Sequence, residues 1–265
     1  MVSNRLIKLR QGLAEKEVDG ILVSQPENRY YLSGFDGSSG YLLITPQDIV
    51  LATDFRYTEQ ARVQAPDYQI TKITGDVTDW LPPLLAELKV SRLGFEAGHV
   101  TFATYRQLSD ILKKAGGNLQ LVPLDGVVET LRAIKEPGEI ELISRGAEIS
   151  DQAMAFGMNV VRAGMTEKEL AWEIERCLRE NGSRALPFEV IVASGPNAAL
   201  PHAKPSSRQI GSGEPVVIDI GARFGGYSSD LSRSICLGEA DDAFKKIYDT
   251  VLGAQLAAIA LIREG

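Results

Sequence analysis

Short apolar runs alternate with amphipathic runs over residues 21–122, and this alternation constrains the fold more than any other feature. Runs typical of strands occupy residues 21–24, 41–44, 49–53, 93–96 and 119–122. Runs typical of helices occupy residues 55–63, 81–88 and 102–114, the second with prolines 82 and 83 in its first turn, where proline is tolerated. Strands that alternate with helices predict an α/β layer domain.

The pattern changes after Pro123, where helical periodicity replaces the alternation. Residues 127–162 have mostly helical spacing, and a second helix is expected from Thr166, with a capping box to Glu169, as far as Gly182. Strands are expected at 189–193, 216–220 and 227–235, followed by a last helix over 240–263. We therefore predict two domains, at residues 1–126 and 127–265, the second of α+β class.

Charge and composition exclude several classes of protein. The chain carries 28 Lys and Arg against 35 Asp and Glu, a net charge of −7, whereas a nucleic-acid partner usually needs a basic face. Hydrophobic residues make up 44% of the chain, which is enough to bury a core. The two cysteines, Cys177 and Cys236, exclude a disulfide scaffold, indicate a reducing compartment and are expected to be structural thiols.

No segment of the sequence indicates a membrane partner. The first twenty residues have scattered charges and no apolar centre, so we expect no signal peptide. The longest apolar stretch, Val251–Ile262, is too short to span a bilayer and predicts a buried helix. We therefore expect a soluble, cytoplasmic protein.

The segment most informative about chemistry is a predicted hairpin over residues 216–235. Gly225-Gly226 supplies the positive φ that a tight hairpin needs. If Phe224 and Gly225 form the two-residue turn, Asp219 lies directly opposite Asp230, on the less apolar face of the sheet. Two opposed carboxylates repel each other, and a divalent cation between them removes that repulsion.

On spacing alone, this pair of aspartates has two interpretations. Asp219 and Asp230 could clamp a pair of metal ions about 3.5–4 Å apart. Alternatively, one of them is exposed at a ragged sheet edge and the other caps a turn, since a bulge or a shift of register would break the pairing.

Both histidines of the chain lie outside the predicted strands and helices. His202 belongs to a loop rich in glycine and proline, residues 195–205, where a neutral imidazole could donate to a substrate carbonyl or share a proton. The alternative is a surface histidine without a role. His99 lies at a strand-to-helix turn, where a structural role is favoured.

Three further motifs carry weaker signals. The spacing of Gly34, Gly37 and Gly40 lacks the strand and helix context of a dinucleotide-binding motif and predicts a loop. Asp54 in Asp-Phe-Arg-Tyr predicts a helix N-cap, with an Arg–Tyr pair reaching into a pocket as the alternative. The G-x-S-x-G nucleophile motif is absent, which argues against an α/β-hydrolase.

Several ordered motifs resemble the proline-specific metallopeptidases, the Xaa-Pro dipeptidases (prolidases) and aminopeptidase P, which share their fold with creatinase and methionine aminopeptidase. Residues 28–35 and 53–61 resemble the creatinase-type N-terminal domain. Residues 191–202 resemble the loop of the family's substrate histidine, and residues 218–221 and 226–234 resemble its first two metal ligands in their context. The resemblance covers essentially the whole chain.

The resemblance implies an α/β N-terminal creatinase-like domain followed by an α+β pita-bread catalytic domain. It implies Asp219 and Asp230 as ligands of a dinuclear site of manganese, cobalt or zinc, with Asp230 bridging the two ions. The implied reaction is metal-dependent hydrolysis of the bond before proline in proline-containing peptides. His202 is implied to bind the substrate and to stabilise the tetrahedral intermediate, and a homodimer is a possible assembly.

Two departures from the family pattern affect these expectations. Ser232 and Ser234 stand where the family commonly has threonines, which keeps the hydroxyl groups. The family completes its site with a later histidine and two glutamates, but no histidine follows His202 here and no later acid lies in a matching motif. We therefore expect a C-terminally truncated pita-bread domain with an incomplete metal site and weak or absent hydrolysis.

Two alternatives to a Xaa-Pro peptidase remain. A creatinase-like amidinohydrolase works without metal, and Asp219 and Asp230 argue against it because such an enzyme has no need of them. A non-catalytic binding module of the same fold is the other alternative.

Overall fold

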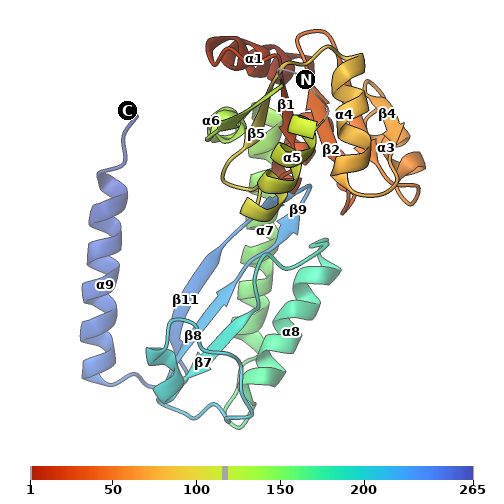
Figure 1. Ribbon diagram of the computed structural model, residues 1–265. Coiled ribbons are helices and arrows are strands. Elements are labelled where there is room, and N and C mark those ends of the chain that lie inside the picture. The colour runs from red at the N-terminus through yellow and green to blue at the C-terminus, as the bar shows by residue number, and fades with distance from the viewer. Residues whose placement is uncertain (1, 115–118, 265) are drawn as a thin grey trace. The chain divides into compact units, whose positions relative to one another are not determined.

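A computed structural model describes residues 2–114 and 119–264, which form two compact units (Figure 1). The first unit ends at Lys135 and the second begins at Glu136. Helix α6 (Val127–Ala133) belongs to the first unit, because its Val128 is buried in one core with Leu9 of helix α1 (Val2–Glu15). The observed boundary thus lies after α6, whereas the prediction placed it before this helix.

A mixed sheet of six strands forms the middle layer of the first unit, in the order β4-β3-β2-β1-β5-β6. Its strands are β1 (Gly20–Val23), β2 (Tyr41–Ile44), β3 (Ile49–Thr53), β4 (Gln69–Lys72), β5 (Arg92–Glu96) and β6 (Gln120–Leu124). β1, β5 and β6 are parallel, as are β3 and β4, while β2 is antiparallel to both neighbours. The chain continues from β1 to one side of the sheet and from β5 to the other, so their ends form a topological switch point.

Helices cover both faces of this sheet. Besides α1 and α6 they are α2 (Pro26–Ser33), α3 (Thr58–Gln64), α4 (Val77–Glu87) and α5 (Phe102–Lys114). Ile21 of β1 is buried with Leu9 and Leu32 on one face, and Leu22 is buried with Leu85 on the other. Successive residues of β1 therefore face opposite helical layers, and the predicted α/β layer domain is confirmed.

The second unit is built on a three-stranded antiparallel sheet in the order β11-β8-β7. Its elements are α7 (Pro137–Val160), α8 (Glu167–Glu180), β7 (Ile191–Ser194), the 3-10 helix η1 (Gly195–Ala199), β8 (Pro215–Ile220), β9 (Arg223–Phe224), β10 (Tyr227–Ser228), β11 (Leu231–Cys236) and α9 (Asp242–Ala260). Ile218 and Ile220 of β8 are buried with Ile149 of α7 and Ile174 of α8, on the face of the sheet that these helices cover (Figure 1). The other face of β8 is less buried.

Capping residues determine where two helices begin. Glu169 N donates to Thr166 Oγ at 3.2 Å and Thr166 N donates to the Glu169 carboxylate at 2.7 Å, so the predicted capping box of α8 is confirmed. Asp76 and Asp79 form the same motif before α4. Because α4 therefore begins at Val77, its two prolines lie within the helix and not in the first turn, contrary to our prediction.

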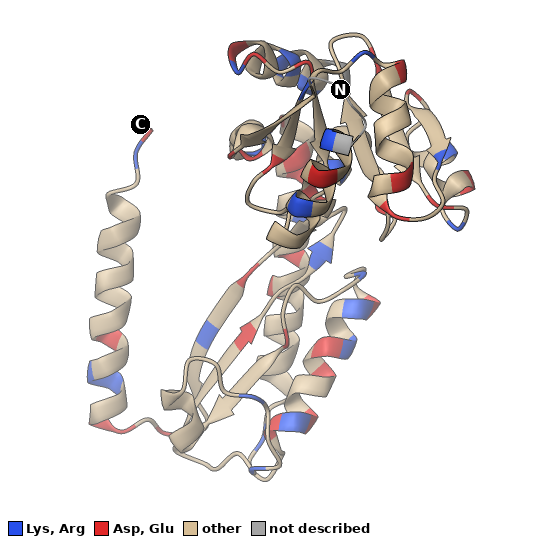
Figure 2. Cartoon of the chain, in the orientation of Figure 1, with Lys and Arg blue, Asp and Glu red and all other residues tan. Residues whose placement is uncertain are grey.

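Helix α8 presents one charged face and one apolar face. Acidic and basic residues alternate along it (Figure 2), and Arg176 forms ion pairs with Glu173 at 2.6 Å and with Glu180 at 3.1 Å. Such exposed pairs contribute little to stability. Leu170 and Ile174 are fully buried on the opposite face, so burial of this apolar face fixes the orientation of the helix.

Helix α9 confirms the last predicted helix but not its burial. Ile247 is 66% exposed, Val251 63% and Leu256 56%. The prediction of a buried helix over Val251–Ile262 is wrong for this structure, because none of its helical residues is buried by the described parts of the chain. None of the described helices is long and apolar enough to cross a membrane.

The turn between β9 and β10 yields a testable prediction. Gly225 has a φ of 55°, and a Cβ atom there would lie 2.7 Å from Leu142 Cδ2. We expect Gly225→Ala to lower the free energy of unfolding by about 1–3 kcal/mol, because positive φ strains alanine and the methyl group displaces Leu142. Urea denaturation measures this change.

Gly253→Ala is the matched control, because no atom lies within 4 Å of a Cβ there and a helix interior favours alanine over glycine. Equal urea midpoints for Gly225→Ala and Gly253→Ala would contradict the prediction.

Candidate active site

Asp219 lies in β8, the middle strand of the sheet in the second unit. Its partner on β11 is Ser232, so the prediction that Asp219 directly opposes Asp230 is wrong. The Ser232 hydroxyl donates a hydrogen bond to Asp219 Oδ1 at 2.8 Å. On its other side Asp219 pairs with Ile191 of β7. The backbone of Asp219 is therefore fixed between two strands, and its carboxylate is oriented by a serine.

The error in register comes from the turn. Phe224 pairs with Tyr227, so the two turn residues are Gly225 and Gly226, both with positive φ, and not Phe224 and Gly225. Moving the turn by one residue along the chain changes the partner of each residue on the opposite strand by two positions, here from Asp230 to Ser232 for Asp219. Because an even shift keeps each side chain on its face, Asp219 still lies on the less buried face of β8, as predicted.

Asp230 directly precedes β11, at a break in the hairpin, and is exposed. The Ser229 hydroxyl beside it donates to the Gly146 carbonyl at 3.0 Å and lies 2.7 Å from Ser150 Oγ, so α7 holds the break in place. Since alternate residues of a strand share a face, Asp230 falls on the side of Asp219 as its diagonal neighbour.

The less buried face of this sheet offers carboxylate oxygens to a cation, but few of them. Asp219 and Asp230 come to the same end of the sheet, and hard divalent ions prefer such ligands. Across residues 2–114 and 119–264, no group of three or more His, Cys, Asp or Glu side chains is arranged to hold a metal ion. The two aspartates therefore fit part of a metal site, and the implied dinuclear cluster lacks further ligands here.

His202 is exposed and lies in the segment between β7 and β8. This segment leaves the sheet after Ser194, whose partner on β8 is Val216. At about 3.4 Å per residue, Val216 is about 10 Å along the strand from Asp219. The loop of His202 thus starts at the opposite end of β8 from the two aspartates.

Glu167, the first residue of α8, was not among the predicted site residues. It is fully buried, and its carboxylate accepts hydrogen bonds from the backbone N–H groups of Ser194 and Ser206, on either side of the His202 loop. An acidic residue in the first turn of a helix is common because it complements the helix dipole, so its spacing carries no signal of this contact.

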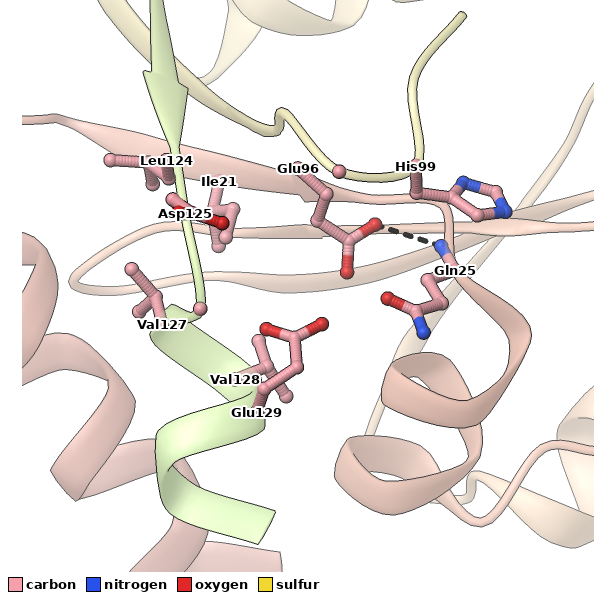
Figure 3. Close-up of a pocket in the computed structure, with 11 residues that line it drawn as sticks. Ile21, Gln25, Glu96, His99, Leu124, Asp125, Val127, Val128 and Glu129 are labelled. Carbon is pink, nitrogen blue, oxygen red and sulfur yellow. Dashed lines mark hydrogen bonds between the residues drawn. The ribbon is translucent and has the colours of Figure 1, made fainter. Parts of the chain in front are cut away.

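A second buried carboxylate, that of Glu96, lies at the topological switch point of the first unit, where β1 and β5 end (Figure 3). Glu96, at the end of β5, accepts hydrogen bonds on Oε2 from the N–H groups of Ser24 (2.7 Å) and Gln25 (2.8 Å), and on Oε1 from Asn28 Nδ2 (2.7 Å). The carboxylate thus takes the place at the start of α2 where an anionic ligand would bind. His99 Nδ1 lies 2.9 Å from Ser24 Oγ, which is a structural contact.

A cavity of about 270 Å³ lies beside this carboxylate and is lined in part by Asp125 and Glu129 (Figure 3). The polar groups beside the cavity form hydrogen bonds with one another: Asn28 Nδ2 donates to Glu129 Oε1 at 2.6 Å, and Arg132 donates to Asn28 Oδ1 at 2.8 Å. These contacts join α2 to α6 and account for the cluster as part of the scaffold.

The Asp54 motif differs from both of its predicted forms. The N-cap of α3 is Tyr57, so the prediction that Asp54 caps this helix is wrong. Asp54 pairs with the Arg56 guanidinium at 2.9 Å, and this hydrogen bond holds the pKa of the Asp54 carboxyl well below its usual range. Arg56 also lies over the ring of Tyr57, at 5.4 Å from its centroid, on an exposed loop.

The remaining motifs are structural. Gly34 ends α2, and Arg29 donates hydrogen bonds to the carbonyls of Gly37 and Gly40, which holds the predicted loop. Both free cysteines are half-buried, and burial raises the pKa of the Cys177 thiol, which keeps it protonated.

Comparison with known proteins settles the family. Residues 5–134 match the creatinase/prolidase N-terminal domain, and residues 141–265 match metallopeptidase family M24. An uncharacterized peptidase of Bacillus subtilis is 36% identical over 98% of this chain and 73% of its own length. The chain belongs to the M24 metallopeptidase family.

Other M24 relatives extend the similarity to named peptidases. A Xaa-Pro dipeptidase of Pyrococcus furiosus is 29% identical over 100% of this chain and 73% of its own length. The solved Xaa-Pro dipeptidase from Bacillus anthracis has a TM-score of 0.89 and 36% identity, covering 97% of this chain and 71% of that one. The X-Pro aminopeptidase from Thermotoga maritima gives 0.85 and 34%, covering 94% and 70%.

These findings confirm the fold that the resemblance implied. This M24 chain consists of an N-terminal α/β creatinase domain followed by part of the α+β pita-bread domain.

The Glu96 cluster leads to a prediction about stability. Replacing the buried carboxylate by Glu96→Gln turns an amide N–H₂ toward groups that are themselves donors. We expect the free energy of unfolding to fall by about 2–4 kcal/mol, because the N–H groups of Ser24 and Gln25, in the connection between β1 and α2, lose their carboxylate acceptor. Chemical denaturation followed by circular dichroism measures the loss.

The control is Glu87→Gln, at an exposed position of α4 in the same unit, which we expect to change stability by less than about 0.5 kcal/mol. Similar losses in the two variants would show that the cluster has no special role.

Proposed function

We propose that this M24 chain carries part of a site for metal-dependent hydrolysis of Xaa-Pro peptide bonds. One feature supports this most: Asp219 lies on the less buried face of β8, and Asp230 directly precedes β11 at the same end of the sheet, on the same face if the alternation of β11 is continued by one residue. Relatives that match the whole chain are named Xaa-Pro dipeptidases. In this proposal the two aspartates are metal ligands and His202 is the catalytic, substrate-binding residue.

Each residue has a chemical task in this proposal. The Ser232 hydroxyl orients the carboxylate of Asp219 through its hydrogen bond to Oδ1. Divalent manganese, cobalt or zinc, when bound, supplies polarisation of the carbonyl before proline and activation of a water. His202 donates a hydrogen bond to the same carbonyl oxygen and stabilises the charge that develops there. Because the Xaa-Pro amide has no N–H, recognition through its carbonyl suits this bond.

We further propose that the site is incomplete in this chain. Fewer than three potential ligands come together among the described residues, and metal affinity falls with the number of ligands. Proline-containing peptides are the proposed partners, in a cytoplasmic protein that can form a homodimer and needs neither nucleic acid nor membrane.

Titration with Mn²⁺ in a calorimeter tests the assignment of the aspartates. We expect weak binding by the chain that falls at least tenfold in Asp219→Asn and in Asp230→Asn, because each substitution removes one of two carboxylate ligands. Asp249→Asn, at an exposed position of α9, should leave the affinity unchanged.

Binding that neither substitution weakens would show that the aspartates are not ligands, and no binding at all would favour a non-catalytic binding module. The same samples are assayed with a Xaa-Pro dipeptide, for which we expect little or no turnover. Efficient turnover that Asp219→Ala abolishes would overturn the proposal of an incomplete site. Metal-independent hydrolysis of creatine would favour the amidinohydrolase.

A further inference from the structure

The carboxylate of Glu167 is tied to both ends of the loop that carries His202. Its Oε1 accepts hydrogen bonds from Ser194 N (2.7 Å) and Ser194 Oγ (2.8 Å), where β7 ends. Its Oε2 accepts from Ser206 N (3.0 Å) and Ser206 Oγ (2.6 Å), where the chain returns. Asn197 Nδ2 lies 3.1 Å from both oxygens. One side chain therefore closes the loop at its base.

Backbone N–H groups at the start of α8 also bind the end of the His202 loop. Lys168 N donates to the Ser206 carbonyl and Glu167 N donates to the Arg208 carbonyl, each at 3.1 Å. The first N–H groups of a helix have no acceptor within the helix, so these bonds satisfy donors that would otherwise need water. Residues 206–208 are thus fixed to the N-terminus of α8 in two ways: they donate hydrogen bonds to the Glu167 carboxylate, and their carbonyls accept hydrogen bonds from the helix.

An ion pair fixes the start of the loop as well. Arg208 Nη1 donates to Ser194 Oγ at 2.7 Å and to Glu214 at 2.8 Å, and Arg208 Nη2 donates to the same carboxylate at 2.5 Å. This pair packs against Gly195, where a Cβ atom would lie 2.7 Å from Arg208 Nη2. Ser194 therefore joins the buried carboxylate of Glu167 to the guanidinium of Arg208.

Between the hydrogen bonds at Ser194 and those at Ser206, the side chains of the loop pack little against the rest of the protein. Of residues 195–205 only Ala203 is buried, and His202 is exposed. Lys204 forms an exposed ion pair with Glu189 at 3.2 Å, which contributes little. The position of the imidazole therefore depends on how the base of the loop is held.

We propose that Glu167 is a positioning residue for His202: its buried carboxylate holds the loop in the conformation that presents the imidazole to substrate. This inference rests on the proposed function, in which His202 meets the substrate carbonyl. Glu167 is fully buried and cannot itself reach substrate, so it acts through Ser194 and Ser206. The proposed substrate contact His202 thus depends on a carboxylate that does not itself touch substrate.

The test compares Glu167→Gln with wild type in the whole chain, by hydrogen exchange and by NMR of the histidine rings. We expect amides near 194–206 to exchange at least about tenfold faster, since a glutamine offers one acceptor oxygen where the carboxylate offers two. The ring signal of His202 should shift and narrow as the loop loosens. His99, the other histidine of the chain, lies in the first unit and is the internal reference.

Two variants make the result specific. Glu167→Asp keeps the charge on a shorter side chain and should restore part of the protection. Glu141→Gln, at an exposed position of α7, should leave exchange and both ring signals unchanged. If Glu167→Gln unfolds the unit, Ser206→Ala is used instead, because it removes one hydroxyl donor and leaves the carboxylate in place.

Addition of Mn²⁺ separates this inference from the proposed function. In wild type we expect bound Mn²⁺ to broaden the His202 ring signal, and the broadening to change in Glu167→Gln at equal metal occupancy. Unchanged exchange and unchanged His202 signals in Glu167→Gln would overturn the positioning role. Faster loop exchange together with no broadening in wild type would support the positioning role and contradict the proposed metal site.

The same network predicts a dependence on pH. Burial acts to raise the pKa of Glu167, but the hydrogen bonds from Ser206 and Ser194 outweigh it, and the pKa lies below its usual range. Arg208 likewise lowers the pKa of Glu214, the other acid of the network. Carboxyls with a lowered folded pKa stabilise the fold above their unfolded pKa, about 4.3, and lose that contribution as pH falls through the folded value.

We therefore expect wild type to be more stable than Glu167→Gln at pH 7, and the two urea midpoints to converge below about pH 4 as the carboxylate is protonated. A difference in midpoint that stays constant down to pH 3 would contradict a role for the ionised carboxylate.

Discussion

Burial of alternate residues along β8 governs the rest of the second unit. Val216, Ile218 and Ile220 are fully buried against α7 and α8, and burial of each such side chain contributes about 1.5–3 kcal/mol. A slip of one residue would expose these side chains and push Asp219 into the core, where an unpaired carboxylate is very unfavourable. Hydrophobic burial therefore keeps Asp219 on the outer face without any contact to the carboxylate itself.

The same periodicity explains which parts of the site could be predicted from sequence. The face of Asp219 follows from a period of two, so it was predicted correctly. The pairing of Asp219 with Ser232 depends on whether the turn begins at Phe224 or at Gly225, and both choices place a glycine in the turn. The periodicity of the sequence therefore determines which face a side chain lies on, while the position of the turn determines which residue it pairs with on the next strand.

Elements with buried polar residues were harder to predict. Helix α2 buries Asn28 and Arg29, so its sequence lacks the apolar spacing of an amphipathic helix, and it was not predicted. Glu96 and Glu167 both accept backbone N–H groups from segments remote in sequence, at Ser24 and at Ser194. Such contacts join residues that only the folded chain brings together, and a glutamate at a strand end or a helix start has no pattern that reveals them.

Buried and exposed carboxylates thus have separate tasks in this chain. Glu96 and Glu167 are buried and each accepts hydrogen bonds from several donors, which joins strands to helices. Asp230 is exposed and Asp219 half-buried, so water solvates their charges. As diagonal neighbours about 7 Å apart, they repel each other by less than about 1 kcal/mol in water, less than if directly opposed. The sheet therefore tolerates both charges without a cation, and its fold does not depend on the metal that the site is proposed to bind.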